Sequence, residues 1–119
     1  MEGFWTIQFT GIQGWGAGVV TLVGGRVFGG DSGYLYEGTY TQQANTLHAR
    51  VHVRPLAAGV PNVMGLSEFD LEMTGTLSGS AIPVTGSIPG TPLRLSGTLT
   101  KRQDLPTRAG VIPRLDLRS

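Results

Sequence analysis

Hydrophobic and polar residues alternate with a period of two along most of this chain. The alternation is plain in residues 4–10 and 34–42, and glycines interrupt it at short intervals. A period of two places successive side chains on opposite faces of an extended strand, whereas a helix has a period of ~3.6 residues. The pattern therefore predicts eight strands, at about residues 4–10, 16–23, 26–30, 34–42, 46–54, 68–77, 81–88 and 93–100.

Four of these strands carry a glycine between two apolar residues that share its face. Glycine weakens a strand, so its repetition on the apolar face indicates places where the sheet coils tightly or another side chain comes close. A closed barrel needs such places, and closure also removes the two edges that an open sheet exposes. The sequence therefore predicts an all-β fold, an eight-stranded antiparallel up-and-down β-barrel. The glycines are Gly38, Gly75, Gly86 and Gly97.

Composition and charge set the class of the domain. The chain has 119 residues, of which 39% are hydrophobic and 14% are charged, and its net charge is +1. This length suits one domain, predicted at residues 1–104, and over residues 105–119 the alternation fails and prolines predict a flexible C-terminal tail. The basic residues are scattered, which argues against nucleic-acid binding.

The chain shows no sign of a secretory or membrane segment. It has no cysteine, its first residues lack a basic segment followed by an apolar one, and no run approaches the ~20 apolar residues of a membrane helix. We therefore expect a cytoplasmic protein without a membrane partner.

Charged residues alternate on two neighbouring predicted strands. If the strands at residues 46–54 and 68–77 pair as a hairpin, opposite charges face one another, and each pair contributes ~0.2–1 kcal/mol and fixes the register. We favour this structural interpretation, and the alternative is a surface recognition patch. The two histidines lie ~13 Å apart along a strand, too far to share a metal ion. The predicted pairs are Arg54 with Glu68, His52 with Asp70 and Arg50 with Glu72, with His48 ending the row.

Residues 29–33 predict a tight turn. Gly29, Gly30 and Gly33 can adopt positive φ angles, and the Asp31 side chain can accept hydrogen bonds from nearby backbone amides. Gly30-Asp31-Ser32-Gly33 also matches the core of the chymotrypsin-like serine protease motif, but both histidines follow this serine and the chain is too short for two barrels. The turn is therefore interpreted as structural, and the alternative is that Asp31 holds a loop or a ligand.

Two groups of apolar side chains need cover. Six aromatic residues are expected to fill one end of the barrel, with ligand stacking as the alternative: Trp5, Phe9, Trp15, Tyr34, Tyr36 and Tyr40. The connection at residues 55–67 is unusually apolar for a loop, so it is expected either to cap the barrel mouth or to be covered by another chain. Its candidate contact residues are Leu56, Val60, Val63, Met64 and Leu66.

Glycine and aromatic motifs in the first half of the chain resemble those of a known family. The motifs are Gly3-Phe4-Trp5-x-Ile7-x-Phe9, Gly16-x-Gly18-Val19-Val20, Gly25-x-Val27-x-Gly29-Gly30-Asp31 and Tyr36-x-Gly38. They resemble the GrlR-like family, whose best-known member is a negative regulator of type III secretion genes. The resemblance implies a lipocalin-like barrel, commonly a homodimer, that acts by binding a transcriptional activator. The acidic run that this member carries after the Tyr-x-Gly strand is replaced here by Gln42-Gln43-Ala44-Asn45.

Two functions are consistent with these features. The leading hypothesis is a non-catalytic regulatory module that acts through contact with a protein partner, and the sequence does not identify that partner. The alternative is a lipocalin-like carrier of a small apolar ligand, because an eight-stranded barrel is just wide enough to hold one. An enzyme is not expected, since no nucleophile and base form a readable pair, and no cofactor or metal is implied. The volume of the barrel interior separates the two hypotheses.

Overall fold

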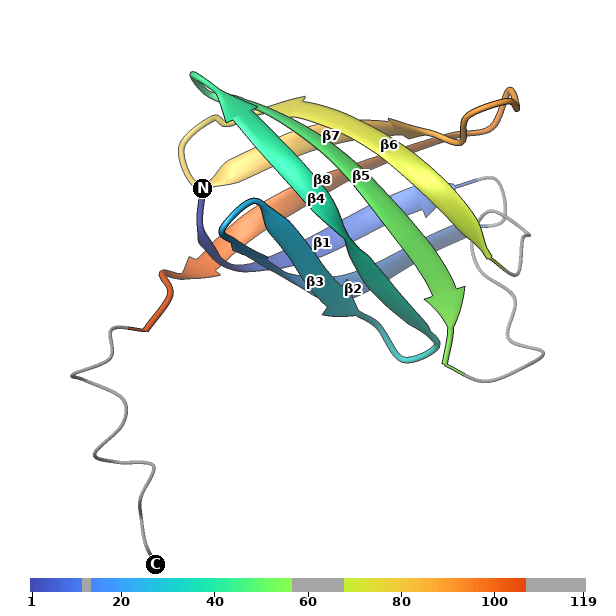
Figure 1. Ribbon diagram of the computed structural model, residues 1–119, viewed down its shortest axis with the longest axis horizontal. Helices are drawn as coiled ribbons and strands as arrows, with labels where there is room; N and C mark the ends of the chain where they lie inside the picture. Colours follow the sequence, from blue (N-terminus) through green and yellow to red (C-terminus); the bar gives the residue numbers. More distant parts are fainter. Residues whose placement is uncertain (12–13, 57–67, 107–119) are drawn as a thin grey trace, which may run out of the picture.

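The computed structural model describes residues 1–11, 14–56 and 68–106, and every regular element in these residues is a strand (Figure 1). The strands match the eight predicted from the period-two alternation, with small shifts at their ends. The described residues contain no helix long and apolar enough to cross a membrane. The strands are β1 (Gly3–Gly11), β2 (Gly14–Val23), β3 (Arg26–Gly30), β4 (Tyr34–Gln43), β5 (Thr46–Pro55), β6 (Phe69–Thr76), β7 (Ala81–Ser87) and β8 (Arg94–Gln103).

The strands close into a barrel in which each pairs antiparallel with the next along the chain. The last strand, β8, pairs with β1, where Thr6 lies opposite Thr100 and Phe9 opposite Gly97. The prediction of an eight-stranded antiparallel barrel is therefore confirmed. The strand predicted to end at Thr100 extends to Gln103, because Lys101 and Gln103 continue the pairing with β1.

Three of the four glycines predicted on the apolar face, Gly38, Gly75 and Gly97, lie where the backbone of a neighbouring strand comes too close for a side chain, whereas Gly86 faces the Leu71 and Met73 side chains. A Cβ atom on Gly38 would collide with the backbone carbonyl of Arg50 on β5, and one on Gly97 would lie 2.5 Å from the Gln8 carbonyl oxygen on β1. The residues next to these glycines along each strand point outward, as the exposed Thr74 beside Gly75 and Thr85 beside Gly86 show. Glycine therefore permits the tight coiling that closes this small barrel.

Among the described residues, the turns between β2 and β3 and between β4 and β5 are two-residue loops. The β2–β3 turn uses Gly24 and Gly25 at φ angles of 57° and 79°, which glycine adopts at no steric cost. The β4–β5 turn instead places Ala44 at a φ of 55°. A left-handed alanine is unfavourable, so this turn is held by the pairing of the strands on either side.

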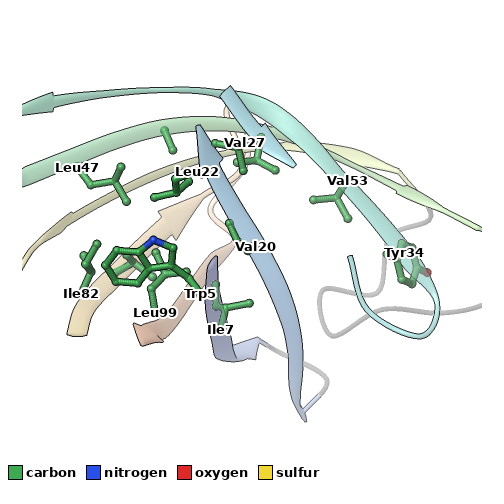
Figure 2. Packing of buried hydrophobic residues seen from close by; sticks show 13 residues of the cluster. Trp5, Ile7, Val20, Leu22, Val27, Tyr34, Leu47, Val53, Ile82 and Leu99 are labelled. Atoms are coloured by element: carbon green, nitrogen blue, oxygen red, sulfur yellow. The ribbon is translucent and has the colours of Figure 1, made fainter. Parts of the chain in front are cut away.

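The inward side chains form a large core cluster around Trp5 and a smaller one of Leu71, Ile88 and Leu95. Trp5 is only 2% exposed, and its indole Nε1 donates a hydrogen bond of 3.0 Å to the Met1 carbonyl oxygen. In Figure 2 the Trp5 ring lies near Ile82, and Tyr34 lies apart from it on the other side of the view. Trp5 therefore closes the end of the barrel at which the chain begins. The largest fully buried side chains are Trp5, Leu22, Leu47, Ile82 and Leu99.

Candidate functional site

The interior of the barrel holds a cavity of about 420 Å³. Its wall is formed mainly by the inward apolar side chains of the strands, so the alternation that builds the barrel also makes its interior apolar. This volume lies within the range of ~300–1,000 Å³ that small-molecule pockets occupy. The lining residues are Ile7, Phe9, Trp15, Gly16, Ala17, Val20, Leu22, Val27, Asp31, Ser32, Gly33, Tyr34, Tyr36, Leu47, Ala49, Val51, Val53, Phe69, Leu71, Met73, Leu95 and Leu99.

The cavity lies toward the end of the barrel that carries the β3–β4 loop. Residues of that loop, Asp31, Ser32 and Gly33, line it, whereas Trp5 and Ile82 at the closed end do not. The six aromatic residues were expected to fill one end together, and this expectation is wrong. Because the inward positions of a strand are spread along the barrel axis, Trp5 closes one end and four of the others line the cavity: Phe9, Trp15, Tyr34 and Tyr36. Trp15 is 73% exposed and belongs to the rim.

The β3–β4 loop is organised by the Asp31 carboxylate. Asp31 Oδ1 accepts hydrogen bonds from the backbone amides of Gly33 (2.9 Å) and Tyr34 (2.8 Å), and the Asp31 amide donates to the Tyr34 carbonyl oxygen at 3.0 Å. This Asx-type turn reverses the chain between β3 and β4. Asp31 Oδ2 accepts a further hydrogen bond from the hydroxyl of Tyr36. The carboxylate therefore joins the loop to an inward side chain of β4.

Tyr36 reaches Asp31 because β2, the strand on the other side of β3, leaves room for its ring. A Cβ atom on Gly18 of β2 would lie 2.8 Å from the Tyr36 hydroxyl oxygen, and one on Gly16 would lie 2.7 Å from the ring of Phe9. Burial first, and then the hydrogen bond to the Asp31 carboxylate, raise the pKa of Tyr36 far above its usual value. Tyr36 is therefore a neutral phenol whose proton points at Asp31.

The structure corrects the reason given for Gly29 and Gly30. Both were expected to adopt positive φ in a turn, as was Gly33, but all three lack it and the first two belong to β3. They are glycines because of close approach. A Cβ atom on Gly29 would collide with the Val19 carbonyl oxygen, and one on Gly30 would lie 2.8 Å from the Tyr34 carbonyl oxygen. The Asp31 side-chain bonds to backbone amides, by contrast, occur as predicted.

The predicted charge row lies on the outer face of β5 and β6, away from the cavity. Arg50 and Glu72 form an ion pair of 2.6 Å, and His52 Nδ1 lies 2.8 Å from an Asp70 oxygen, as predicted. The predicted Arg54–Glu68 pair is wrong, because β5–β6 pairing ends at Val53 opposite Phe69 and the Glu68 carboxylate lies 2.6 Å from His52 Nε2. The hydrogen bonds that His52 makes to the carboxylates of Asp70 and, second, of Glu68 raise its pKa. His48, at the end of the row, is exposed opposite Thr74.

Of the apolar loop, only its start belongs to the described residues. Leu56 is 53% exposed, and its amide donates a 2.8 Å hydrogen bond to the Gly33 carbonyl oxygen, which places it beside the loop at the cavity. The other predicted contact residues, Val60, Val63, Met64 and Leu66, lie outside the described residues. The prediction that they cap the barrel mouth or contact another chain stays a prediction.

Sequence reasoning did not find the walls of the cavity. The alternation predicts Val20, Ala49 and Val51 only as strand residues, although their short side chains leave the space that longer ones would fill. One signal was present, the pair Gly16-x-Gly18 on a strand predicted beside aromatic neighbours. A second hollow of about 980 Å³ is lined largely by polar residues of β1 and β4–β8, among them the charge-row members His48, Arg50 and Glu72.

Comparisons with known proteins do not place this chain in a family. A scan against protein-family models and a search of the curated proteins each found no match. The resemblance to the GrlR-like family therefore stays a prediction from the motifs.

Proposed function

We propose that this barrel binds a small, largely apolar molecule in its interior cavity. The observation that supports the proposal is the volume of about 420 Å³ lined by apolar side chains of β1–β6 and β8. Ligand pockets are typically apolar hollows with a few polar groups that fix orientation, and eight-stranded barrels are just wide enough to hold one small ligand. This cavity has both components, an apolar wall and the Asp31–Tyr36 pair.

Binding in such a cavity is driven by the removal of apolar surface from water. Each Å² of apolar surface that is buried contributes ~25 cal/mol, and a rigid, preformed site avoids part of the cost of ordering the protein. The barrel supplies this rigidity, since each of its strands is paired on both sides. The expected ligand therefore has an apolar body that is no larger than the cavity.

Fluorescence titration tests the proposal. The probe is the neutral fluorophore N-phenyl-naphthylamine, whose emission rises in apolar surroundings, and we expect saturable binding to the native protein. Val51→Phe replaces an isopropyl group with a phenyl ring that projects into the cavity, and it is expected to weaken binding about tenfold or more. Phe28→Ser, on the outer face of β3, is the control and should leave the affinity unchanged.

Two results would contradict an interior site. The first is a lack of saturable binding to the native protein. The second is a loss of binding in the Phe28→Ser variant while Val51→Phe binds normally, because the probe would then occupy the surface. Circular dichroism of both variants checks that each keeps its strands.

A second candidate function is regulation through contact with a protein partner. It is favoured by the exposed apolar side chains of Val19, Phe28 and Leu35 on the outer face of β2–β4. Gly30 of β3 pairs with Val19 on one side and with Leu35 on the other, so no side chain separates these two residues. Apolar patches of this kind often mark interaction sites. A pull-down from the native host with the Phe28→Asp variant tests it, because a partner that uses this face is captured only by the native protein. A GrlR-like role, a homodimer and a cytoplasmic location stay predictions.

A further inference from the structure

Asp31 is the one charged residue among the described residues that line the cavity. It lies at the β3–β4 loop, at the end of the cavity away from Trp5, while the rest of the wall is apolar apart from Ser32 and aromatic hydroxyl and indole groups. A charge beside an apolar cavity is costly unless it is paired. Its surroundings therefore indicate what kind of group the cavity accepts.

The protein itself supplies Asp31 with neutral partners. The carboxylate accepts hydrogen bonds from two backbone amides and from the Tyr36 hydroxyl, and in the described part of the chain it forms no ion pair with a lysine, arginine or histidine. These bonds fix the position of the carboxylate without neutralising it. A carboxylate has room for about four hydrogen bonds, so it can still accept one from a ligand.

We propose that the ligand is an amphipathic amine, whose ammonium group binds at the Asp31 carboxylate while its apolar part fills the barrel. This inference rests on the proposed function and specifies the chemistry of the molecule bound there. An ammonium supplies both the N–H donor and the positive charge that the carboxylate lacks. A charge-assisted bond of this kind is roughly twice as strong as a neutral hydrogen bond.

The aromatic residues of the same cavity suit a cation as well. The proton of the Tyr36 hydroxyl is directed to Asp31, so its oxygen presents lone pairs, which accept from N–H groups. The rings of Phe9, Tyr36 and Trp15 line the cavity, and the faces of such rings attract ammonium groups within ~6 Å. Acceptor oxygens and ring faces both favour a cationic head group.

The same arrangement disfavours an anionic ligand such as a fatty acid. No lysine, arginine or histidine is among the described residues that line the cavity, so no cation of the protein is there to bind a ligand carboxylate. A ligand carboxylate placed at this end would face Asp31, and like charges at close range disfavour each other. The preference between head groups therefore distinguishes this inference from general apolar binding.

Isothermal titration calorimetry at neutral pH, with octanol, octylamine and octanoate as matched probes, tests the inference. Octanol has the same apolar chain but a neutral hydroxyl head group, so it tests the proposed function without a charge on the ligand. Octylamine, which is protonated under these conditions, is expected to bind at least about tenfold more tightly than octanol to the native protein. Octanoate is expected to bind more weakly than octanol.

Two variants assign the preference to Asp31. Asp31→Asn keeps an oxygen for the backbone amides but removes the charge, and we expect octylamine and octanol to bind it equally. Ser32→Lys keeps the hydrogen bonds of the Asp31 carboxylate and adds an ammonium group on the neighbouring residue. This variant should also lose the preference for octylamine over octanol. It tests the role of Asp31 if Asp31→Asn fails to fold. Glu37→Gln, which neutralises an exposed carboxylate on β4, is the matched control and should keep the preference.

Each outcome separates this inference from the proposed function. If octanol and octylamine bind the native protein equally, or octanoate binds best, the amine proposal is wrong and the apolar carrier stands. If Asp31→Asn folds and keeps the preference, the carboxylate is not its origin and the proposal is also wrong. If none of the three probes binds, the proposed function fails, and this inference fails with it.

Discussion

Packing differs between the part of the barrel that holds the cavity and the part that does not. The same substitution, valine to leucine, made at one position in each part measures this difference. Val51 lines the cavity, whereas Val84 is buried without lining it. Val84 Cγ1 lies 2.8 Å from the point where a Cβ atom on Gly75 would stand, so Val84 already fills the space over this glycine. Changing each valine to leucine adds one methylene group to each part.

The expected effects have opposite signs. In Val51→Leu the added methylene enters the cavity, and its burial stabilises the protein by about 0.8 kcal/mol. In Val84→Leu the same group has to displace its neighbours, and such overpacking costs about 1–3 kcal/mol. The two variants should therefore differ by ~2–4 kcal/mol, which for a domain of this size corresponds to ~8–15 °C in Tm.

Urea unfolding followed by tryptophan fluorescence provides the measurement. Trp5 is buried and Trp15 is exposed, so most of the change in emission reports the exposure of Trp5 on unfolding. Equal slopes against urea for the two variants would show that stability alone changed. If Val51→Leu destabilises the protein as much as Val84→Leu does, the interior around Val51 is not hollow and the reasoning about the cavity fails.

Three further predictions concern the sheet, a turn and the charge row. Gly38→Ala should destabilise the barrel by about 3 kcal/mol or more, because its Cβ would meet a backbone carbonyl. Gly86→Ala meets only the movable side chains of Leu71 and Met73 and should cost less than ~1 kcal/mol in the same urea assay. Ala44→Gly should raise the free energy of unfolding by ~0.5–1 kcal/mol, because it replaces an alanine in the left-handed region with a glycine. An unchanged midpoint of urea unfolding would contradict this strain. The raised pKa of His52 means that its ion pairs stabilise the fold fully below its usual value of 6.5 and lose their effect as the pH rises through the raised value. Relative to His52→Gln, the native protein should gain less than ~1 kcal/mol at acid pH, because the pair is exposed, and nothing at alkaline pH, and the absence of any difference between the two proteins at acid pH would contradict the role of these pairs.

The sequence predicted most of the barrel, and the reason is local. Strand positions follow from alternation within a few residues, and glycines such as Gly38 and Gly97 mark close approach wherever they share a face with apolar neighbours. Register beyond the hairpin ends was less predictable. The Arg54–Glu68 pair was extrapolated past the last paired residues, and there the Glu68 side chain turns to His52 instead.

The cavity could not be predicted, because it depends on distances between strands far apart in the sequence. Val20, Ala49 and Val51 would face inward equally in a filled barrel and in a hollow one, and the difference is set by how widely the closed sheet curves. The role of Asp31 was predicted in part. Its bonds within the loop follow from sequence spacing, whereas its bond to Tyr36 needs the space that Gly18 leaves on another strand.

The seam between β1 and β8 has a consequence for how the molecule assembles. Seven of the eight pairings join strands that follow one another, while the seam joins Thr6 to Thr100. Bringing such distant segments together carries the largest loop-closure entropy, so we expect the seam to form last during folding. Until it forms, two strand edges are free to pair with those of another molecule, and the same edges reappear whenever the seam opens. Refolding at high protein concentration should therefore yield strand-swapped assemblies joined through β1 and β8.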